Sequence, residues 1–538
     1  MKPSARWPLS LLALAALLAA CSKPAEAPPA ASPAGAPASA AQAQASAGID
    51  WQQAASDADV DAAFARAVAE RKPLFVYWGA KWCPPCNQVQ ATLFNRVDFI
   101  ERSRAFVPVY IDGDSPGAQK LGARFKVRGY PTLLLFTPDG RELTRLPGEV
   151  DAQQMTQVLT LGMNAQRPVK AVLADARAGA QMLSANDWRL LAFYSWETDE
   201  QQIVPKAELP ALLQQLAAAC PADQAETATR LMLKAAALTD AKATPRANAA
   251  LRGRALAVLS DAPAARAQMD VLTNYAADIV RALSTAKSPE RAALVGAFDA
   301  ALTRLQADAT LSRADRLTAL EARVDLVKID TAKAVLPDTL LAEVREQAAR
   351  NDREITDGYE RQAVITSAAY LLEQAGLVAE SDALLKANLA KSHSPYYLMS
   401  QLSSNAKRRG DKADALHWSQ QAFDSAEGPA TRLQWGASYV GTLVELAPKD
   451  EARIERAAQQ LFNEAAAQPN AFYERSARSL QRAADKLQAW NQGKAHSAVL
   501  QRLRLQLGSV CARLPADDAQ RAVCEGLFKP AARSRRSA

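Results

Sequence analysis

Two cysteines separated by two prolines, Cys83 and Cys86, are the residues of this chain whose types and spacing could carry out chemistry. The apolar, aromatic and β-branched run 74–78 before them predicts a strand, and residues 87–94 after them predict an amphipathic helix. Cys83 would then stand at a helix N-terminus, where unpaired N–H groups and the positive dipole end favour a thiolate. Cys86 would lie one turn further on, within reach of a disulfide. This arrangement predicts two-electron thiol–disulfide exchange.

The same spacing could instead be half of a zinc site, but zinc requires four ligands. The remaining candidate ligands of these types are Cys21, Cys220, Cys511, Cys524, His393, His417 and His496. None of them forms a second spaced pair near the motif, so the sequence favours redox chemistry and predicts neither a bound metal nor another cofactor. Carriage of Cu(I) by the soft thiolate pair is a further alternative. The methionine-rich surroundings expected for it are absent from the sequence.

Residues 49–163 resemble the thioredoxin superfamily. The run Trp82-Cys83-Pro84-Pro85-Cys86 is similar to its active-site motif, residues 109–112 to its central strand, and residues 125–136 to the segment that carries its cis-proline. The resemblance implies an α/β thioredoxin fold with Cys83 and Cys86 as the catalytic pair. It also implies that Pro131 is the cis-proline facing the sulfurs, and that Trp82, Tyr130 and Thr132 help to shape a groove for an extended substrate segment.

The elements expected around the motif alternate as an α/β layered sheet requires. Helices are predicted at 57–71, 97–104, 119–125 and 151–163, and a strand at 106–111. Pro138-Asp139-Gly140 predicts a turn between strands at 132–137 and 141–146.

One departure from the superfamily and the residues between the cysteines both concern the chemistry. Many thioredoxins carry a buried aspartate six residues before the first motif cysteine, where this chain has Tyr77, and their usual lysine partner falls near Pro108. Deprotonation of Cys86 must then rely on water, on Tyr77 or on a substrate group. The residues between the cysteines, Pro84 and Pro85, offer neither a charge nor an N–H donor, in contrast to the histidine typical of strong oxidants. The sequence therefore favours a reductant.

The first 48 residues predict export and anchoring. Residues 1–20 read as a signal peptide with a basic start and a Leu/Ala core too short to span a bilayer. Their end, Leu18-Ala19-Ala20-Cys21, resembles a bacterial lipobox, which implies lipidation of Cys21; an ordinary cleaved signal is the alternative. Residues 21–48, the lipidated cysteine and an Ala/Pro-rich stretch, predict a disordered tether. Ser22 favours the outer membrane, with the cysteines on the periplasmic face of a Gram-negative-type envelope.

Residues 166–528 predict a large all-α domain, because Ala, Leu, Gln and Arg dominate and helical periodicity persists between prolines. Gly376 and Gly410 lie 34 residues apart, as do Pro395 and Pro429, which resembles tetratricopeptide-like helical hairpins. Such a domain could be a packing scaffold or could bind a peptide or a partner. Residues 529–538 form a basic tail within a net charge of +7. No basic–aromatic platform for nucleic acid is present.

The other cysteines and the histidines are expected to have structural rather than catalytic roles. Cys511 and Cys524 flank a turn and predict a structural disulfide in an oxidising compartment. Cys220 has no evident partner and is expected to be buried and inert. The three histidines are expected to lie singly on helices.

Together these features predict a lipid-anchored periplasmic thiol–disulfide oxidoreductase, in which a more exposed Cys83 attacks and Cys86 resolves. Its partners would be disulfide-containing envelope proteins, a thiol reductase at the membrane that supplies electrons, and a protein or peptide bound by the helical domain. The rival interpretation is a non-catalytic adaptor whose helical domain binds an envelope partner.

Overall fold

The computed structural model describes residues 48–165, 167–179, 183–200, 202–239 and 249–529. The predicted signal peptide, Cys21, the tether up to residue 47 and the basic tail after Lys529 lie outside the described residues.

A five-stranded mixed sheet has the order β1-β3-β2-β4-β5. Its strands are β1 (Gln52–Gln53), β2 (Leu74–Gly79), β3 (Val107–Asp112), β4 (Thr132–Phe136) and β5 (Glu142–Leu146). The central strand β2 runs parallel to β3 and antiparallel to β4. All six of its residues are buried, which explains why its sequence is continuously apolar rather than alternating.

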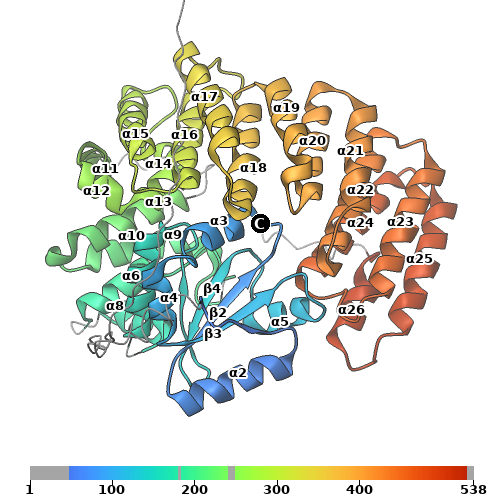
Figure 1. The fold of residues 1–538 in the computed structure, drawn as a ribbon, viewed down its shortest axis with the longest axis horizontal. Helices are drawn as coiled ribbons and strands as arrows, with labels where there is room; N and C mark the ends of the chain where they lie inside the picture. The colour runs from blue at the N-terminus through green and yellow to red at the C-terminus, as the bar shows by residue number, and fades with distance from the viewer. Residues whose placement is uncertain (1–47, 166, 180–182, 201, 240–248, 530–538) are drawn as a thin grey trace, which may run out of the picture. The chain divides into compact units, whose positions relative to one another are not determined.

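Helices cover both faces of this sheet (Figure 1). They are α2 (Asp57–Glu70), α3 (Pro84–Thr92), α4 (Val97–Ser103), α5 (Ala118–Phe125) and α6 (Ala152–Met163). Alternate side chains of β2 enter two cores, because successive residues of a strand point to opposite faces. Val76 and Trp78 belong to one core with α2 and α5, whereas Phe75 and Tyr77 belong to a second core that also contains Cys83 and Cys86.

The rest of the described chain is helical, and the predicted class, a thioredoxin-like α/β fold followed by an all-α region, is confirmed. The first half contains α7 (Val169–Arg177), α8 (Ala185–Ala192), η1 (Lys206–Glu208), α9 (Leu209–Ala219), η2 (Ala222–Gln224), α10 (Ala225–Ala237), α11 (Ala249–Ser260), α12 (Ala262–Ala267), α13 (Met269–Asn274), α14 (Ala276–Leu283), α15 (Pro289–Ala307), α16 (Arg313–Val327) and α17 (Asp338–Glu354).

The second half begins at α18 and contains the segment in which the 34-residue period was found. Its helices are α18 (Gly358–Gln374), α19 (Val378–Asn388), η3 (Leu389–Lys391), α20 (Pro395–Arg409), α21 (Lys412–Asp424), α22 (Pro429–Leu446), α23 (Glu451–Ala466), α24 (Glu474–Trp490), α25 (Ser497–Ala512) and α26 (Ala519–Gly526). Gly376 and Gly410 both have positive φ, at 87° and 78°, and follow α18 and α20, so each predicted turn falls on a glycine.

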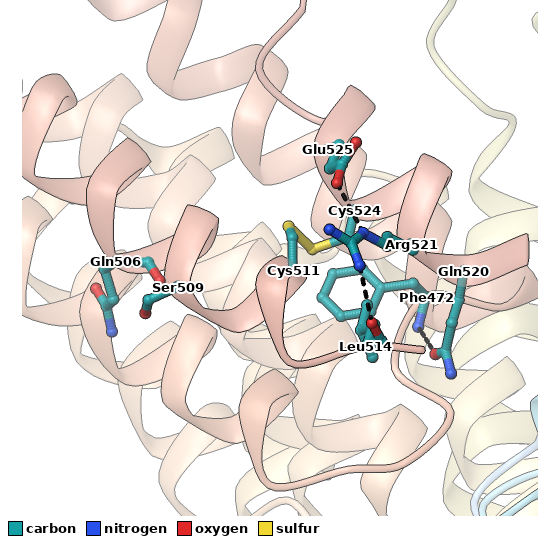
Figure 2. The surroundings of a disulfide bond; sticks show 9 residues. All are labelled: Phe472, Gln506, Ser509, Cys511, Leu514, Gln520, Arg521, Cys524 and Glu525. Carbon is teal, nitrogen blue, oxygen red and sulfur yellow. Dashed lines mark hydrogen bonds and ion pairs between the residues drawn. A yellow bond between two sulfur atoms is a disulfide. The ribbon is translucent and has the colours of Figure 1, made fainter. Parts of the chain in front are cut away.

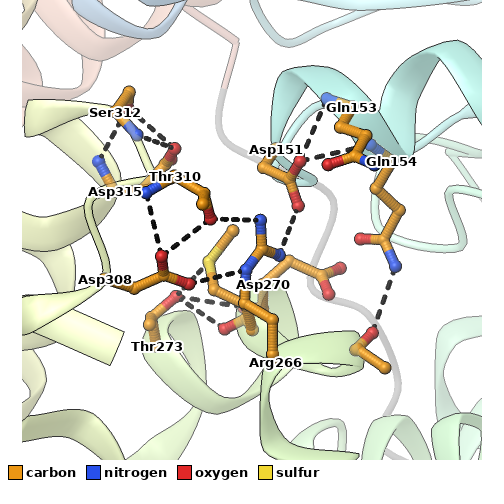
Figure 3. Close-up of polar contacts among 12 residues, drawn as sticks. Asp151, Gln153, Gln154, Arg266, Asp270, Thr273, Asp308, Thr310, Ser312 and Asp315 are labelled. Carbon is orange, nitrogen blue, oxygen red and sulfur yellow. Dashed lines mark hydrogen bonds and ion pairs between the residues drawn. The ribbon is translucent and has the colours of Figure 1, made fainter. Parts of the chain in front are cut away.

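The helical region and the thioredoxin-like domain share one core. Phe75 and Tyr77 of β2 belong to the same continuous buried cluster as residues of α8 to α16 and α20 to α26. A polar contact adds to it at α6 (Figure 3). Asp151, which caps α6 by accepting from the N–H groups of Gln153 and Gln154, also accepts from Arg266 of α12 at 2.8 Å. Arg266 continues to Asp308 at 2.9 Å and so joins α6 to the end of α15.

Near the end of the described chain, Cys511 of α25 and Cys524 of α26 are joined by a disulfide (Figure 2). Both cysteines are buried and their Cα atoms lie 5.6 Å apart. The turn between the two helices is also held by Arg521, which donates to the Leu514 carbonyl. The disulfide therefore fixes α26 onto the preceding helix.

No helix in the described part of the chain is both long enough and apolar enough to cross a membrane.

Candidate redox site

The cysteine pair begins α3, as its sequence predicts. Cys83 is the N-cap of this helix, and Pro84 and Pro85 occupy its first positions, where a missing N–H costs no hydrogen bond. The Cys86 N–H donates to the Cys83 Sγ at 3.3 Å, and both thiols are free. The helix N-terminus therefore points a donor at the sulfur that would carry negative charge.

The expectation that Cys83 is the more exposed sulfur is wrong. Both cysteines are only 3% exposed. Burial raises the pKa of the Cys83 thiol well above its ordinary value, and this desolvation outweighs the opposing effects of the Cys86 N–H and of the Arg475 guanidinium. Burial therefore opposes the thiolate that the helix end favours.

Three aromatic and cationic side chains from different elements surround the Trp82 ring. Tyr397 of α20 stacks on it with centroids 5.8 Å apart and planes 18° apart. The guanidinium of Arg475, from α24, lies 4.3 Å from the centroid, a cation–π contact. Tyr130 meets the ring edge-on at 5.7 Å. Trp82 itself is 9% exposed, so the residue expected to contact a substrate is covered by the helical region.

Side chains of the helical region also reach α3 and the motif backbone. Gln362 of α18 donates to the Trp82 carbonyl at 3.3 Å. Asn87 of α3 donates to the Cys83 carbonyl at 2.8 Å, and its Oδ1 lies 3.1 Å from Nε2 of His393. At the next position, Gln88 donates to Asp315 of α16 at 2.6 Å. The motif backbone and the first two turns of α3 are thus held from three segments of the helical region.

The histidine predictions need correction. His417 lies within α21, but His393 lies in the loop between η3 and α20, and His496 precedes α25. His393 is brought to α3 across 306 positions of sequence, which helical periodicity could not reveal. Burial, with a smaller effect of the Lys81 charge, lowers the pKa of His393.

Asp114 contacts the motif and could not be singled out from the sequence. It follows β3, and its carboxylate accepts from Trp82 Nε1 at 2.7 Å and from the backbone N–H and hydroxyl of Thr431 at 2.8 and 2.5 Å. Arg475 lies 3.9 Å away. Gly428 must lack a side chain here, since it has φ of 83° and an added Cβ would stand 2.7 Å from Cβ of Asp114. An aspartate in a turn is common in any sequence, so nothing in the local pattern singled it out.

The segment that carries the candidate cis-proline lies at the same end of the sheet as the motif. The Tyr130–Pro131 peptide bond is cis. Thr132, which begins β4, pairs with Trp78 near the end of β2, so Tyr130 and Pro131 lie beyond the strand end that leads to Cys83. Tyr130 also stacks on Trp78 at 5.7 Å. The structure thus brings Trp82 and Tyr130 into direct contact, with Pro131 and Thr132 next in the chain.

The Tyr77 hydroxyl is directed at the backbone of Cys86 from a buried aromatic pocket. Its ring is enclosed by Trp51, Phe94 and Tyr110, and its hydroxyl donates to the Cys86 carbonyl at 3.5 Å. Burial, followed by the neighbouring Cys86 thiol, raises the pKa of Tyr77 well above its ordinary value. Of the three proton acceptors considered for Cys86, Tyr77 is therefore disfavoured, which leaves water or a substrate group.

The remaining cysteine, Cys220, is half-buried at the end of α9, more exposed than expected. Burial, and next the Asp223 carboxylate, raise its pKa to about 11, which keeps it a thiol at neutral pH. No group of three or more His, Cys, Asp and Glu residues among the described ranges has an arrangement that could hold a metal ion.

Similarity to known proteins is found in the thioredoxin-like domain. A family model described as a thioredoxin-like domain matches residues 60–162. The thiol:disulfide interchange protein DsbD 1 of Pseudomonas aeruginosa is 30% identical over 114 residues, 20% of this chain and 19% of that protein. Thioredoxin 1 of Chlorobaculum tepidum is 33% identical over 85 residues, 16% of this chain and 79% of that protein.

Among solved structures, oxidised thioredoxin O2 of Arabidopsis thaliana matches with 24% identity and a TM-score of 0.17, over 20% of this chain and 91% of that one. The chain spans less than a fifth of the length of the DsbD proteins it matches, since it covers 17% to 19% of them.

Proposed function

The chain belongs to the thioredoxin family through residues 60–162, and from this premise we propose that Cys83 and Cys86 form its reactive dithiol. The observation that carries the proposal is the geometry of the pair. Cys83 caps α3, its sulfur accepts the Cys86 N–H, and both thiols are free. The fold and the relatives support thiol–disulfide oxidoreductase activity at the level of the family.

In the proposed reaction the Cys83 thiolate attacks one sulfur of a substrate disulfide. That S–S bond breaks, a mixed disulfide forms, and the leaving thiolate takes up a proton. The Cys86 thiolate then attacks the Cys83 sulfur and releases the second substrate thiol. Two electrons pass from the dithiol to the substrate, and the enzyme is left with a Cys83–Cys86 disulfide. Trp82, Tyr130, Pro131 and Thr132 would contact the substrate segment beside this reaction.

The proposed direction is reduction of the substrate. A strong oxidant owes its potential to a stabilised thiolate in its reduced form. Here two prolines separate the cysteines, and burial raises the pKa of the Cys83 thiol rather than lowering it. The reduced form therefore lacks the thiolate stabilisation of a strong oxidant, so the reduced protein should readily donate its electrons to a substrate disulfide.

The proposed setting is the periplasmic face of a bacterial envelope, with a lipid anchor at Cys21 and the outer membrane favoured. Support comes from the lipobox-like residues 18–21 and from the Ala/Pro-rich tether. The domains proposed are the signal peptide 1–20, the tether 21–48, the thioredoxin-like domain 49–163, the helical domain 166–528 and the tail 529–538.

The proposed partners of the protein are disulfide-containing envelope proteins and a membrane thiol reductase. The helical domain would contact a protein or peptide.

The burial of the motif adds a condition to this function. Tyr397, Arg475 and Gln362 cover Trp82 and Cys83, so a disulfide on the rigid surface of a folded protein cannot approach the sulfur in this arrangement. Exchange with such a client requires these side chains, or the helices that carry them, to move away. A flexible segment would demand a smaller movement.

A second candidate function is that of a non-catalytic adaptor. The observation in its favour is the same burial, because the surface around the motif is used to pack α18 and α24. Replacing both Cys83 and Cys86 with serine would spare an adaptor and abolish the function of an oxidoreductase.

The experiment that tests the proposal traps the reaction halfway. Full-length Cys86→Ser protein should form a stable mixed disulfide with a thiol-reactive disulfide substrate, because the resolving thiol is absent. Full-length Cys83→Ser protein should form none. Equal trapping by both variants, or by neither, would reject the assigned roles.

A further inference from the structure

A cavity of about 610 Å³ opens directly beside the redox motif. One wall is made by Trp82, Pro84 and Pro85, and the opposite walls come from α18, α20 and α22 of the helical region. Because Trp82 and Pro84 flank Cys83 in the chain, anything bound here lies next to the reacting residue. Its volume falls within the range of ligand sites and is large enough for several residues of extended polypeptide.

We propose that this cavity binds a neutral, extended segment of the client polypeptide next to the client's reactive cysteine, so that the helical region selects the substrates of the redox motif. This inference rests on the proposed function, whose substrate class it specifies. The helical region thereby gains a role beyond that of a scaffold.

The charges that line the cavity argue for a peptide rather than a small acidic disulfide. The charged residues among its described lining are Glu373 and Arg408, and these two form an ion pair with each other. A tripeptide-sized thiol with two carboxylates and an ammonium would need two free cations and an anion. Because Glu373 and Arg408 pair with each other, the lining offers no free cation or anion for such a ligand. The cavity is therefore better suited to an uncharged polypeptide segment.

The polar groups of the lining match the amides of a peptide backbone. Hydroxyl and carboxamide side chains, among them Ser400 and Gln401, lie beside the aromatic rings of Tyr397 and Trp435. Two buried polar atoms of this lining have no hydrogen-bond partner: the Gln401 Oε1, an acceptor, and the Trp435 Nε1, a donor. A peptide group supplies one N–H and one C=O, the partners that these two atoms lack, and it reaches them once the Gln401 and Trp435 side chains turn toward the cavity.

The buried cation Arg475 lies behind the cavity wall that contains Gln434. Gln434, which lines the cavity, accepts from Nε of Arg475 at 2.6 Å. Within the described part of the chain, Nη1 and Nη2 of Arg475 have no hydrogen-bond partner, Nη1 lies 3.9 Å from the Asp114 carboxylate, and the side chain is 9% exposed. Since Arg475 also lies over Trp82, a substrate carbonyl that displaced Tyr397 would find these donors close to Cys83.

The test compares two disulfides in reaction with the reduced full-length protein. One is a neutral ten-residue peptide whose central cysteine is held as a mixed disulfide with thionitrobenzoate, and the other is oxidised glutathione. Ser400→Trp fills the cavity, and Gln401→Leu removes the unpaired acceptor at similar size. Ser509→Trp makes the same change on the exposed face of α25, away from the motif, and serves as the matched control. Thermal unfolding establishes that each variant is folded.

Ser400→Trp should lower the rate constant with the peptide disulfide about tenfold or more, and at least fivefold more than the rate constant with glutathione disulfide. Gln401→Leu should lower the peptide rate about fivefold, as expected for one lost hydrogen bond. Ser509→Trp should change neither rate by more than about twofold on the same scale. An equal fall for both substrates, an unchanged peptide rate, or a larger fall with glutathione disulfide would overturn the inference.

A binding measurement separates this inference from the proposed function. Calorimetry with the same peptide carrying serine in place of cysteine requires no redox chemistry. Binding of this peptide by the parent protein, and its loss in Ser400→Trp, would support the cavity as a peptide site. That support would hold even if the protein exchanged no disulfide, which would reject only the proposed function. Absence of peptide binding by a protein that does exchange disulfides would reject the cavity alone.

Discussion

Removal of the Asp114 carboxylate should uncover the redox motif. In Asp114→Ala, the Thr431 backbone N–H and hydroxyl lose the acceptor that they reach from α22, and the Trp82 Nε1–H loses its acceptor within the thioredoxin-like domain. A hydrogen bond to a charged group contributes about 1.5–3 kcal/mol. The two bonds from Thr431 join the helical region to the domain that carries the motif, so they stabilise the covered arrangement by about 3 kcal/mol or more. Because each 1.4 kcal/mol is about a tenfold change, the fraction of molecules with an open motif should rise about 100-fold.

The assay is the rate of alkylation of Cys83 in the reduced full-length protein, measured by mass spectrometry of the peptide that contains it. If alkylation proceeds through the open state, Asp114→Ala should raise the rate about 100-fold, up to that of an exposed thiol. The control is Asp61→Ala, which removes an exposed carboxylate paired with Arg124 on the same domain. A folded Asp114→Ala protein whose Cys83 reacts no faster than in the control would refute the reasoning.

Three other outcomes are expected. The ultraviolet absorbance of the Cys83 thiolate, taken as the difference between the parent protein and Cys83→Ser, should keep rising beyond pH 9, because burial raises the pKa of the thiol well above its ordinary value, whereas a plateau below pH 8 would contradict this. Gly428→Ala should destabilise the protein by about 1–3 kcal/mol in urea unfolding, since it adds strain at positive φ and meets Asp114; an unchanged midpoint would argue against that contact. Replacing Cys511 and Cys524 with serine should cost about 3 kcal/mol for a loop of this length, and a variant as stable as the parent protein would show that the bond is not needed.

The thioredoxin-like domain could be predicted because its signals are local. The apolar run at 74–78 became β2, the motif became the start of α3, and Pro138-Asp139-Gly140 lies between β4 and β5. Each of these depends on neighbours within about ten residues, where propensity, turn chemistry and helix capping act. The helical character of residues after 166 followed from periodicity in the same way.

The cover over the motif could not be predicted, because its contacts join residues hundreds of positions apart. Asn87 meets His393, Gln362 meets the Trp82 carbonyl, and Asp114 meets Thr431. None of these residues is unusual where it stands in the sequence. The error over the exposure of Cys83 has the same origin, since the helix-end argument considered α3 alone and not the desolvation by the helices packed over it.

The measurement that tests the central claim most directly is the reduction potential of the Cys83–Cys86 couple, found by equilibrating the full-length protein in glutathione redox buffers. The account predicts one reversible two-electron couple near the reducing end of the thioredoxin family, about −270 mV, and its loss in the Cys83→Ser protein. A couple near about −120 mV would contradict the proposed direction. The absence of any reversible couple would contradict the claim that this dithiol is the reactive centre.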